Sequence, residues 1–252
     1  MLSWRVCRRS LATTRLVRSD PKLEYPEHAQ LYPNHIPTSL AQKTILALGS
    51  SLMALSDPWR ADMVAVNGEV TGGLALNRMY NKMDAHPEGQ QILRLKPRIN
   101  TTTVDFDALR DLPPDSLGFT YATYSDDHKI TPDSRDTVQF VDDVELAYVM
   151  QRYRETHDLV HAVLDMPTNM VGEVAVKWVE ALQTGLPMCV GGAVLGPIRF
   201  SPKQIRQFRR YRPWAVRVGL NSEFLLNVFY ERRWDQDMDD FRREMRIEPK
   251  PF

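Results

Sequence analysis

Two histidines and two acidic residues between positions 157 and 173 have the types and the spacing of a metal site. His157 and His161 are four residues apart, so on a helix their imidazoles lie one above the other on one face. Asp158 follows His157 directly, about 100° around the same helix, and can reach the edge of the site. Imidazole nitrogens and carboxylate oxygens together suit Zn²⁺, with Fe²⁺ and Mn²⁺ as alternatives.

Glu173 is expected to join this site across a turn. The segment Asp165–Asn169 interrupts the helical pattern, and Pro167 is its midpoint. His161 lies six residues before Pro167 and Glu173 lies six residues after it. In an antiparallel helical hairpin with a short loop, positions equidistant from the turn come level with each other. We therefore expect His157, Asp158, His161 and Glu173 to share one divalent ion.

Other interpretations of the histidine pair remain open. Two histidines at this spacing are common by chance, and two hydrogen-bonded core histidines would give the same pattern. A zinc metalloprotease is excluded because its motif has Glu after the first histidine, where this chain has Asp158. A His-Asp phosphohydrolase would need further ligands, and the other histidines, at 28, 35, 86 and 128, have no helpful spacing.

Helical patterns surround the candidate ligands on both sides of the turn. From about residue 142 to 164, apolar residues follow helical spacing, and both histidines fall on that apolar stripe. Burying two stacked imidazoles near carboxylates is best explained by a shared cation, because unpaired burial costs desolvation. A second helix is predicted from Met170 to Thr184, ended by Gly185 and Pro187.

The rest of the chain predicts an all-α, single-domain helical bundle that contains the metal-binding hairpin. An extended arm is expected over 19–38 and the helical domain over 39–252, with a glycine-rich link at 190–197 and a loose tail at 248–252. No strand-like alternation of convincing length occurs. Further helices are predicted at about 39–56, 73–85, 88–95, 105–111, 116–124, 201–210, 213–229 and 235–246.

The first 18 residues have the composition of a mitochondrial transit peptide. They hold five arginines, several hydroxyl residues and no acidic residue. Their removal would leave 27 of the 32 basic side chains against 32 acidic ones, a net charge of −5. A disordered basic tail is the alternative. The expected location is the mitochondrial matrix.

Bulk properties exclude several classes of protein. The whole chain has no net charge, which gives no reason to expect nucleic acid as a partner. Its two cysteines, at 7 and 189, cannot form a disulfide framework if the first is removed. The longest apolar run, Thr44–Leu55, is too short for a membrane-spanning helix.

A basic stretch follows the predicted glycine-rich link and holds no acidic residue before Glu223. With its interleaved aromatic residues it predicts a face against anionic lipid headgroups. A solvated face or a docking site for acidic partner proteins remains an equal alternative. Its basic residues are Arg199, Lys203, Arg206, Arg209, Arg210, Arg212 and Arg217.

His157-Asp158-x-x-His161, followed by eleven residues and Glu173, resembles the motif of the ubiquinone (coenzyme Q) biosynthesis protein 4 family. The resemblance extends over most of the chain after about residue 30, and all four motif positions match. It implies a peripheral protein on the matrix side of the mitochondrial inner membrane, in a complex with other ubiquinone-biosynthesis enzymes, with a metal at the motif.

The same resemblance implies an activity, the removal of the C1 carboxylate from 4-hydroxy-3-methoxy-5-polyprenylbenzoate, in one form coupled to C1 hydroxylation. Such a metal-dependent decarboxylase needs an open position on the metal, and Asp158 is expected to be the weak or displaceable ligand or a proton shuttle. The alternative is a non-enzymatic scaffold and carrier of prenylated intermediates with a structural metal. Seven methionines could line a groove for the prenyl tail or simply pack the core: Met53, Met63, Met79, Met83, Met150, Met166 and Met170.

Overall fold

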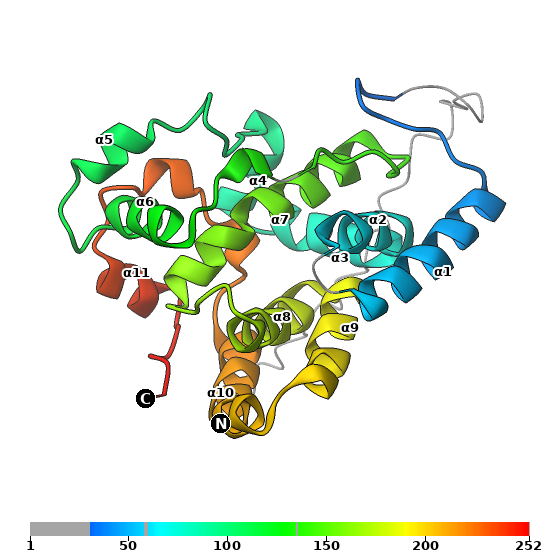
Figure 1. Cartoon of the computed structure of the whole chain (residues 1–252). Helices are drawn as coiled ribbons and strands as arrows, with labels where there is room; N and C mark the ends of the chain where they lie inside the picture. The colour runs from blue at the N-terminus through cyan, green and yellow to red at the C-terminus, as the bar shows by residue number, and fades with distance from the viewer. Residues whose placement is uncertain (1–30, 58–59, 135, 252) are drawn as a thin grey trace, which may run out of the picture.

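Helices make up almost all regular structure in the computed structural model, which describes residues 31–57, 60–134 and 136–251 (Figure 1). Over these ranges there is no strand, only an isolated bridge between Ser116 and Asp237. The all-α prediction is thus confirmed. The helices are α1 (Leu40–Ser56), α2 (Ala61–Thr71), α3 (Gly73–Asp84), α4 (Pro87–Leu95), α5 (Phe106–Arg110), α6 (Leu117–His128), α7 (Val144–Val163), α8 (Met170–Thr184), α9 (Pro187–Leu195), α10 (Pro202–Asn221) and α11 (Met238–Glu244), with short 3₁₀ helices η1 (Pro132–Ser134), η2 (Gly196–Arg199), η3 (Leu225–Asn227) and η4 (Tyr230–Arg232).

Helix α7 runs through the middle of the molecule and carries both histidines (Figure 1). The sequence predicted one apolar stripe, but every residue from Leu146 to Val163 is buried. Burial of its charged residues is compensated by partners from other segments, since a buried unpaired charge is strongly unfavourable. These ion pairs are Arg152 with Glu231, Arg154 with Glu69, and Glu155 with Arg98.

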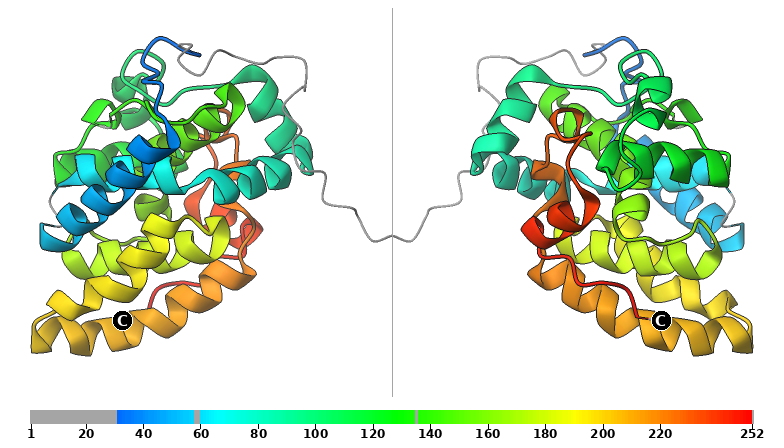
Figure 2. Two further views of the ribbon diagram at one scale, coloured as in Figure 1. Left: turned by 90° about the vertical axis from the view of Figure 1, so that its right-hand side faces the viewer. Right: turned by 90° about the vertical axis from the view of Figure 1, so that its left-hand side faces the viewer.

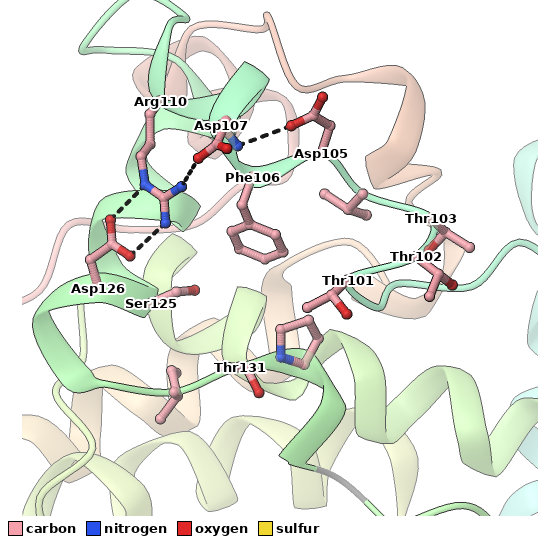
Figure 3. A pocket seen from close by; sticks show the side chains of 13 residues that line it. Thr101, Thr102, Thr103, Asp105, Phe106, Asp107, Arg110, Ser125, Asp126 and Thr131 are labelled. Carbon is pink, nitrogen blue, oxygen red and sulfur yellow. Dashed lines mark hydrogen bonds and ion pairs between the residues drawn. The ribbon is translucent and has the colours of Figure 1, made fainter.

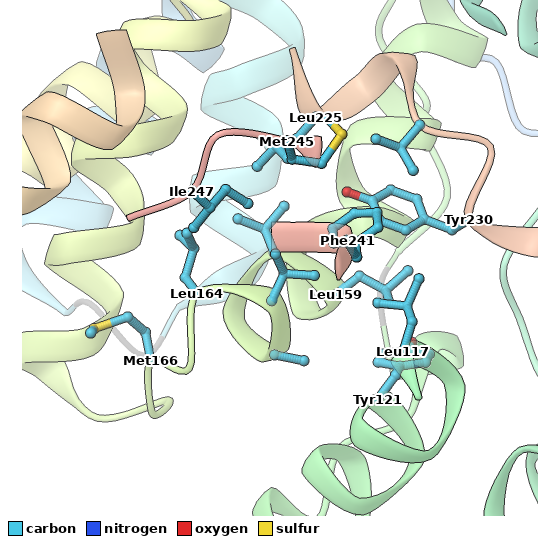
Figure 4. Packing of buried hydrophobic residues seen from close by; sticks show 14 of the residues in the cluster. Leu117, Tyr121, Leu159, Leu164, Met166, Leu225, Tyr230, Phe241, Met245 and Ile247 are labelled. Atoms are coloured by element: carbon cyan, nitrogen blue, oxygen red, sulfur yellow. The ribbon is translucent and has the colours of Figure 1, made fainter. Parts of the chain in front are cut away.

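Two apolar clusters lie along α7. The one drawn in Figure 4 packs the C-terminal half of α7 against α6, α8, α10 and α11, with Leu159, Tyr121 and Phe241 among its residues. The other packs the N-terminal half of α7 against α3, α4 and α9. Met79, Met83, Met150 and Met166 are fully buried in these clusters, so they serve as core residues.

Two predicted boundaries after α8 are wrong. The glycine-rich stretch expected to be a link forms most of α9, whose Cys189 and Ala193 are buried. The two helices expected at 201–210 and 213–229 are one helix, α10, which ends at Asn221 and contains Pro213. Proline in a helix interior removes a hydrogen bond. Packing of α10 against α8, through residues such as Trp214 and Val218, offsets that loss.

Both ends of the described chain are docked onto the body. In the arm, His35 hydrogen-bonds Asp142 just before α7. The expectation of a loose C-terminal tail is wrong up to residue 251, because the Trp214 indole donates to the Glu248 carbonyl and Lys250 pairs with Asp165. The predicted transit segment and residues 19–30 of the arm lie outside the described residues. Helix α2 was missed by the sequence analysis.

The connection between α7 and α8 is tight and fixes where α8 begins. The Met166 amide donates to the His161 carbonyl. The Asn169 side chain caps α8 by accepting from the amides of Val171 and Gly172. Gly172 lies so close to the preceding turn that a β-carbon there would be 1.9 Å from the Pro167 carbonyl oxygen. The next residue is Glu173, so this contact sets the position of a candidate ligand.

We expect Gly172→Ala to lower the free energy of unfolding by about 2 kcal/mol, because the added methyl group must displace backbone. Urea denaturation followed by circular dichroism measures this change. Gly191→Ala is the matched control in α9, where a β-carbon meets nothing within 4 Å; it should leave stability unchanged or raise it by up to about 1 kcal/mol. Equal stability of the two variants would contradict the close approach.

Candidate metal centre

Three of the four predicted ligands come together between α7 and α8. The structure gathers one ligand atom each from His157, His161 and Glu173 within 4.8 Å of one another. The Glu173 Oε2 atom is 3.4 Å from His161 Nε2 and 3.6 Å from His157 Nε2. The two imidazole rings are 4.8 Å apart and nearly perpendicular. The expectation that Glu173 comes level with the histidines across the turn is met.

Hydrogen bonds on the far side of each ring decide which nitrogen faces Glu173 with a lone pair. His157 Nδ1 is 2.6 Å from Glu180 Oε1, and His161 Nδ1 is 3.1 Å from the Met166 carbonyl oxygen. An ionised carboxylate and a carbonyl only accept, so both Nδ1 atoms carry the hydrogen. In the neutral imidazoles, both Nε2 atoms therefore present lone pairs toward the carboxylate of Glu173.

This arrangement of acceptors fits a bound cation. His161 Nε2 is buried and has no hydrogen-bond partner, which is rare for a buried polar atom. Two ligands about 2.1 Å from one tetrahedral zinc ion lie about 3.4 Å apart, close to the separations between Glu173 and the two histidines. The residues present thus fit a divalent metal in both chemistry and spacing.

Electrostatics in the group favour an ionised carboxylate opposite positive charge. Burial raises the pKa of Glu173, but the two histidines outweigh this effect and hold that pKa well below its usual value. Burial lowers the pKa of His157, but the carboxylates of Glu180 and Glu173 together outweigh burial, and the pKa of the imidazole is raised overall. A divalent cation between this carboxylate and the two imidazoles would supply positive charge opposite the ionised Glu173.

A second set of residues, which the sequence analysis missed, supports His157. Glu180 Oε2 accepts hydrogen bonds at 2.7 Å from both Lys177 Nζ and the Tyr153 hydroxyl. The Tyr153 hydroxyl also lies 3.1 Å from Cys189 Sγ. Burial raises the pKa of Glu180, but His157 and Lys177 outweigh it and keep this carboxyl ionised. The sequence could have indicated Glu180 by its spacing, because it lies seven residues, about two helical turns, after Glu173.

Contacts between α7 and α8 follow antiparallel order. Glu173, at the start of α8, faces His161 and His157, while Glu180, two turns later, contacts His157 and Tyr153, one turn earlier on α7. The two helices therefore run antiparallel across this group, whereas metal binding by the hairpin stays a prediction.

Asp158, the fourth predicted ligand, lies outside the gathered group. It is buried on α7, and among the described residues only His157, His161 and Glu173 lie within reach of one ion. A single step along a helix turns a side chain by about 100°, which separates Asp158 from the face that its neighbour presents to α8.

The group is open on one side. The His157 and His161 side chains are 8 and 0% exposed, whereas the Glu173 side chain is 35% exposed. Three protein ligands leave a fourth position on a tetrahedral metal for water or substrate, as in catalytic zinc sites.

All seven residues of the predicted basic face are exposed. Arg199 donates a hydrogen bond to the Leu55 carbonyl at the end of α1, and Arg217 pairs with Glu248. They lie on η2 and α10 and take no part in the group of metal ligands.

A pocket of about 590 Å³ opens elsewhere, beside α5 and α6 (Figure 3). Its wall holds threonines 101–103 and several acidic residues, and Arg110 is paired with Asp107 and Asp126. None of the three gathered ligands lines it. The pocket is therefore separate from the group of candidate metal ligands.

Comparison with known proteins agrees with the resemblance of the motif. The family model for coenzyme Q (ubiquinone) biosynthesis protein Coq4 matches residues 32–251. The mitochondrial ubiquinone biosynthesis protein COQ4 homolog of Xenopus laevis is 53% identical over 221 residues, 88% of this chain and 78% of that protein. The homolog of Mus musculus is 48% identical over 241 residues, 93% of this chain and 91% of that protein.

A crystal structure of a candidate ubiquinone biosynthesis protein from Nostoc punctiforme has the same fold. Its TM-score is 0.65 at 18% identity, over 81% of this chain and 98% of that one. The fold is therefore shared even where the sequences have diverged. With the family model matching nearly all of the described residues, and relatives about half identical, the chain belongs to the Coq4 family of coenzyme Q (ubiquinone) biosynthesis proteins.

Proposed function

We propose that this chain is a metal-dependent carboxy-lyase of ubiquinone biosynthesis. Its substrate would be a 4-hydroxybenzoate that carries a polyprenyl tail, and the reaction would remove the C1 carboxylate. His157, His161 and Glu173 would hold Zn²⁺, with Fe²⁺ or Mn²⁺ as alternatives. The observation that carries this proposal is the three-residue ligand group with one open side at Glu173.

The bound metal would supply Lewis acidity toward a carboxylate or phenolate oxygen. The chain's own residues do the positioning: Glu180 holds His157, and the Met166 carbonyl holds His161, each by the Nδ1 hydrogen. When the C1–carboxylate bond breaks, its electron pair stays on the ring carbon, and that carbon must then take up a proton. The open side at Glu173 admits water as the source of that proton. Asp158 as displaceable ligand or shuttle stays a prediction.

An oxidative form of the reaction, which places a hydroxyl group at C1, would require oxygen and a redox-active metal such as Fe²⁺. Zinc has no redox chemistry and could not support it. The ligand group suits either ion, since imidazole and carboxylate bind both.

The proposed setting is the matrix side of the mitochondrial inner membrane, with the chain as a peripheral protein. The names of the mitochondrial relatives and the arginine-rich composition of residues 1–18 support the mitochondrial part of this proposal. None of the helices in the described ranges has the length and apolar character needed to cross a bilayer. The proposed partners are other ubiquinone-biosynthesis enzymes and their prenylated intermediates.

Loss of a ligand should remove both metal and activity. We expect His161→Ala and Glu173→Gln to reduce bound zinc from about one ion per chain to near zero, because two remaining ligands hold zinc weakly. Turnover of a short-chain prenylated 4-hydroxybenzoate should fall at least 100-fold, with the helical circular dichroism spectrum retained. Metal analysis by mass spectrometry and carbon dioxide release measure these effects.

His86→Ala is the matched control, since His86 is an exposed helix cap of α4; metal content and turnover should match the unaltered protein. If the ligand variants unfold and the unaltered, metal-loaded protein releases no carbon dioxide, the decarboxylase proposal is wrong. The chain would then be a scaffold with a structural metal.

Glu180 should tune the metal affinity without binding the metal. We expect Glu180→Gln to weaken zinc binding about 10- to 100-fold, because a neutral amide no longer raises the basicity of His157. Competition with a chelating dye measures the affinity. Glu145→Gln, at a half-exposed carboxylate on the same helix as the histidines, should leave it unchanged. Equal affinities for the two variants would show that Glu180 does not act on the metal.

A further inference from the structure

Helix α1 and the segment from α9 to η2 expose an unusual number of large apolar side chains. Six residues define this apolar strip: Ile45, Leu48 and Leu52 on α1, Val190 and Val194 on α9, and Ile198 on η2. Their exposed fractions range from 44 to 79%. Exposed apolar residues scattered singly are ordinary, but a contiguous group marks an interaction surface.

The two parts of the strip belong to one face. Helix α1 packs on α2, and α2 packs on α9. The Arg199 side chain, at the end of η2, donates a hydrogen bond to the Leu55 carbonyl at the end of α1. The left view of Figure 2 shows α1, α9 and α10 on the side that faces the viewer.

Positive charge borders the strip, and negative charge is missing from it. The sequence has equal numbers of acidic and basic residues, yet residues 181–222 hold none of the acidic ones. Helix α1 has none either. Lys203, Arg206 and Arg209 of α10 are exposed, and within the ranges that the structure describes no ion pair holds them.

We propose that the apolar strip enters the headgroup region of an anionic lipid bilayer while the basic residues of α10 contact its phosphates. An amphipathic helix that lies in the plane of a bilayer has this combination of an apolar face and a basic border. Burial of the apolar side chains and attraction to anionic lipid add together. This inference rests on the proposed function in one respect, the placement of the chain as a peripheral membrane protein. It adds which face of the molecule contacts the bilayer.

The charge pattern argues against a second copy as the occupant. An interface between two copies related by twofold symmetry would bring the same basic border against itself, and like charges facing each other are unfavourable. A bilayer with anionic lipids complements that border instead.

The metal centre lies one layer beneath this face. Helix α8, which carries Glu173, packs under α9 and α10, and Val174 of α8 packs with Phe200 and Phe208. Contact with the bilayer at the strip would therefore place the ligand group close to the region where a membrane-held prenyl substrate resides.

Vesicle flotation tests the proposal with the chain from residue 19 onward. Vesicles are phosphatidylcholine alone or phosphatidylcholine with one fifth cardiolipin, at about 0.1 M salt, where surface charges still act. We expect binding at least tenfold stronger to the cardiolipin vesicles. Leu48→Glu with Leu52→Glu should reduce it at least tenfold, and Lys203→Glu with Arg206→Glu should reduce it similarly and weaken its salt dependence.

Matched controls lie on α4, outside the strip. Leu95 and Arg94 are both exposed, and Leu95→Glu and Arg94→Glu should bind vesicles like the unaltered protein. Zinc content should be the same in all variants, which separates this test from that of the metal site. Equal loss in the α4 variants, or no cardiolipin preference, would overturn the proposal. So would a dimer in lipid-free solution that Leu48→Glu converts to a monomer.

Discussion

The candidate metal centre depends on one electrostatic constraint: two buried imidazoles direct lone pairs at one carboxylate. The hydrogen on each Nδ1 is committed to Glu180 or to the Met166 carbonyl, so His157 and His161 cannot both turn a hydrogen toward Glu173 while neutral. Acceptors that face each other across a few ångströms repel unless positive charge lies between them. Bound protons can provide that charge. A divalent ion can also provide it, and it binds two or three of these acceptors at the same time.

The rest of the structure holds these three side chains against that repulsion. Helix α7 is enclosed on all sides, and its charged residues are anchored by ion pairs to separate segments, which prevents the helix from rotating. Glu180 is fixed by Lys177 and Tyr153 as well as by His157. The turn before α8 packs against Gly172, and this contact fixes the position of Glu173 in the first turn of α8. Rigid surroundings keep the ligand geometry in place before any ion binds.

Local patterns predicted most of this site, and tertiary contacts decided the remainder. The spacing of His157 and His161 and their distance from Pro167 were sufficient to place Glu173, because helix periodicity and a short turn leave little freedom. Asp158 was predicted as a ligand because it is adjacent to His157 in sequence. Its position about 100° further around the helix separates it from the group of three ligands. Glycines at 191 and 192 and Pro213 suggested interruptions that packing against α8 overrides, because helix propensity is weak relative to tertiary contacts.

The exposed face of α1 shows why sequence pattern alone misleads on burial. Most of its leucines are exposed although they have the spacing of a core-facing helix, while Glu155 and the arginines of α7 are buried. A periodic apolar pattern indicates that one face of the helix must be covered. It does not indicate that the same chain covers that face. Helix α8 joins the two environments: its start supplies Glu173 to the buried polar group, and its outer side supports α9 and α10. A substrate with a polar ring and a long apolar tail needs such an arrangement, a polar centre within one helix layer of an apolar surface.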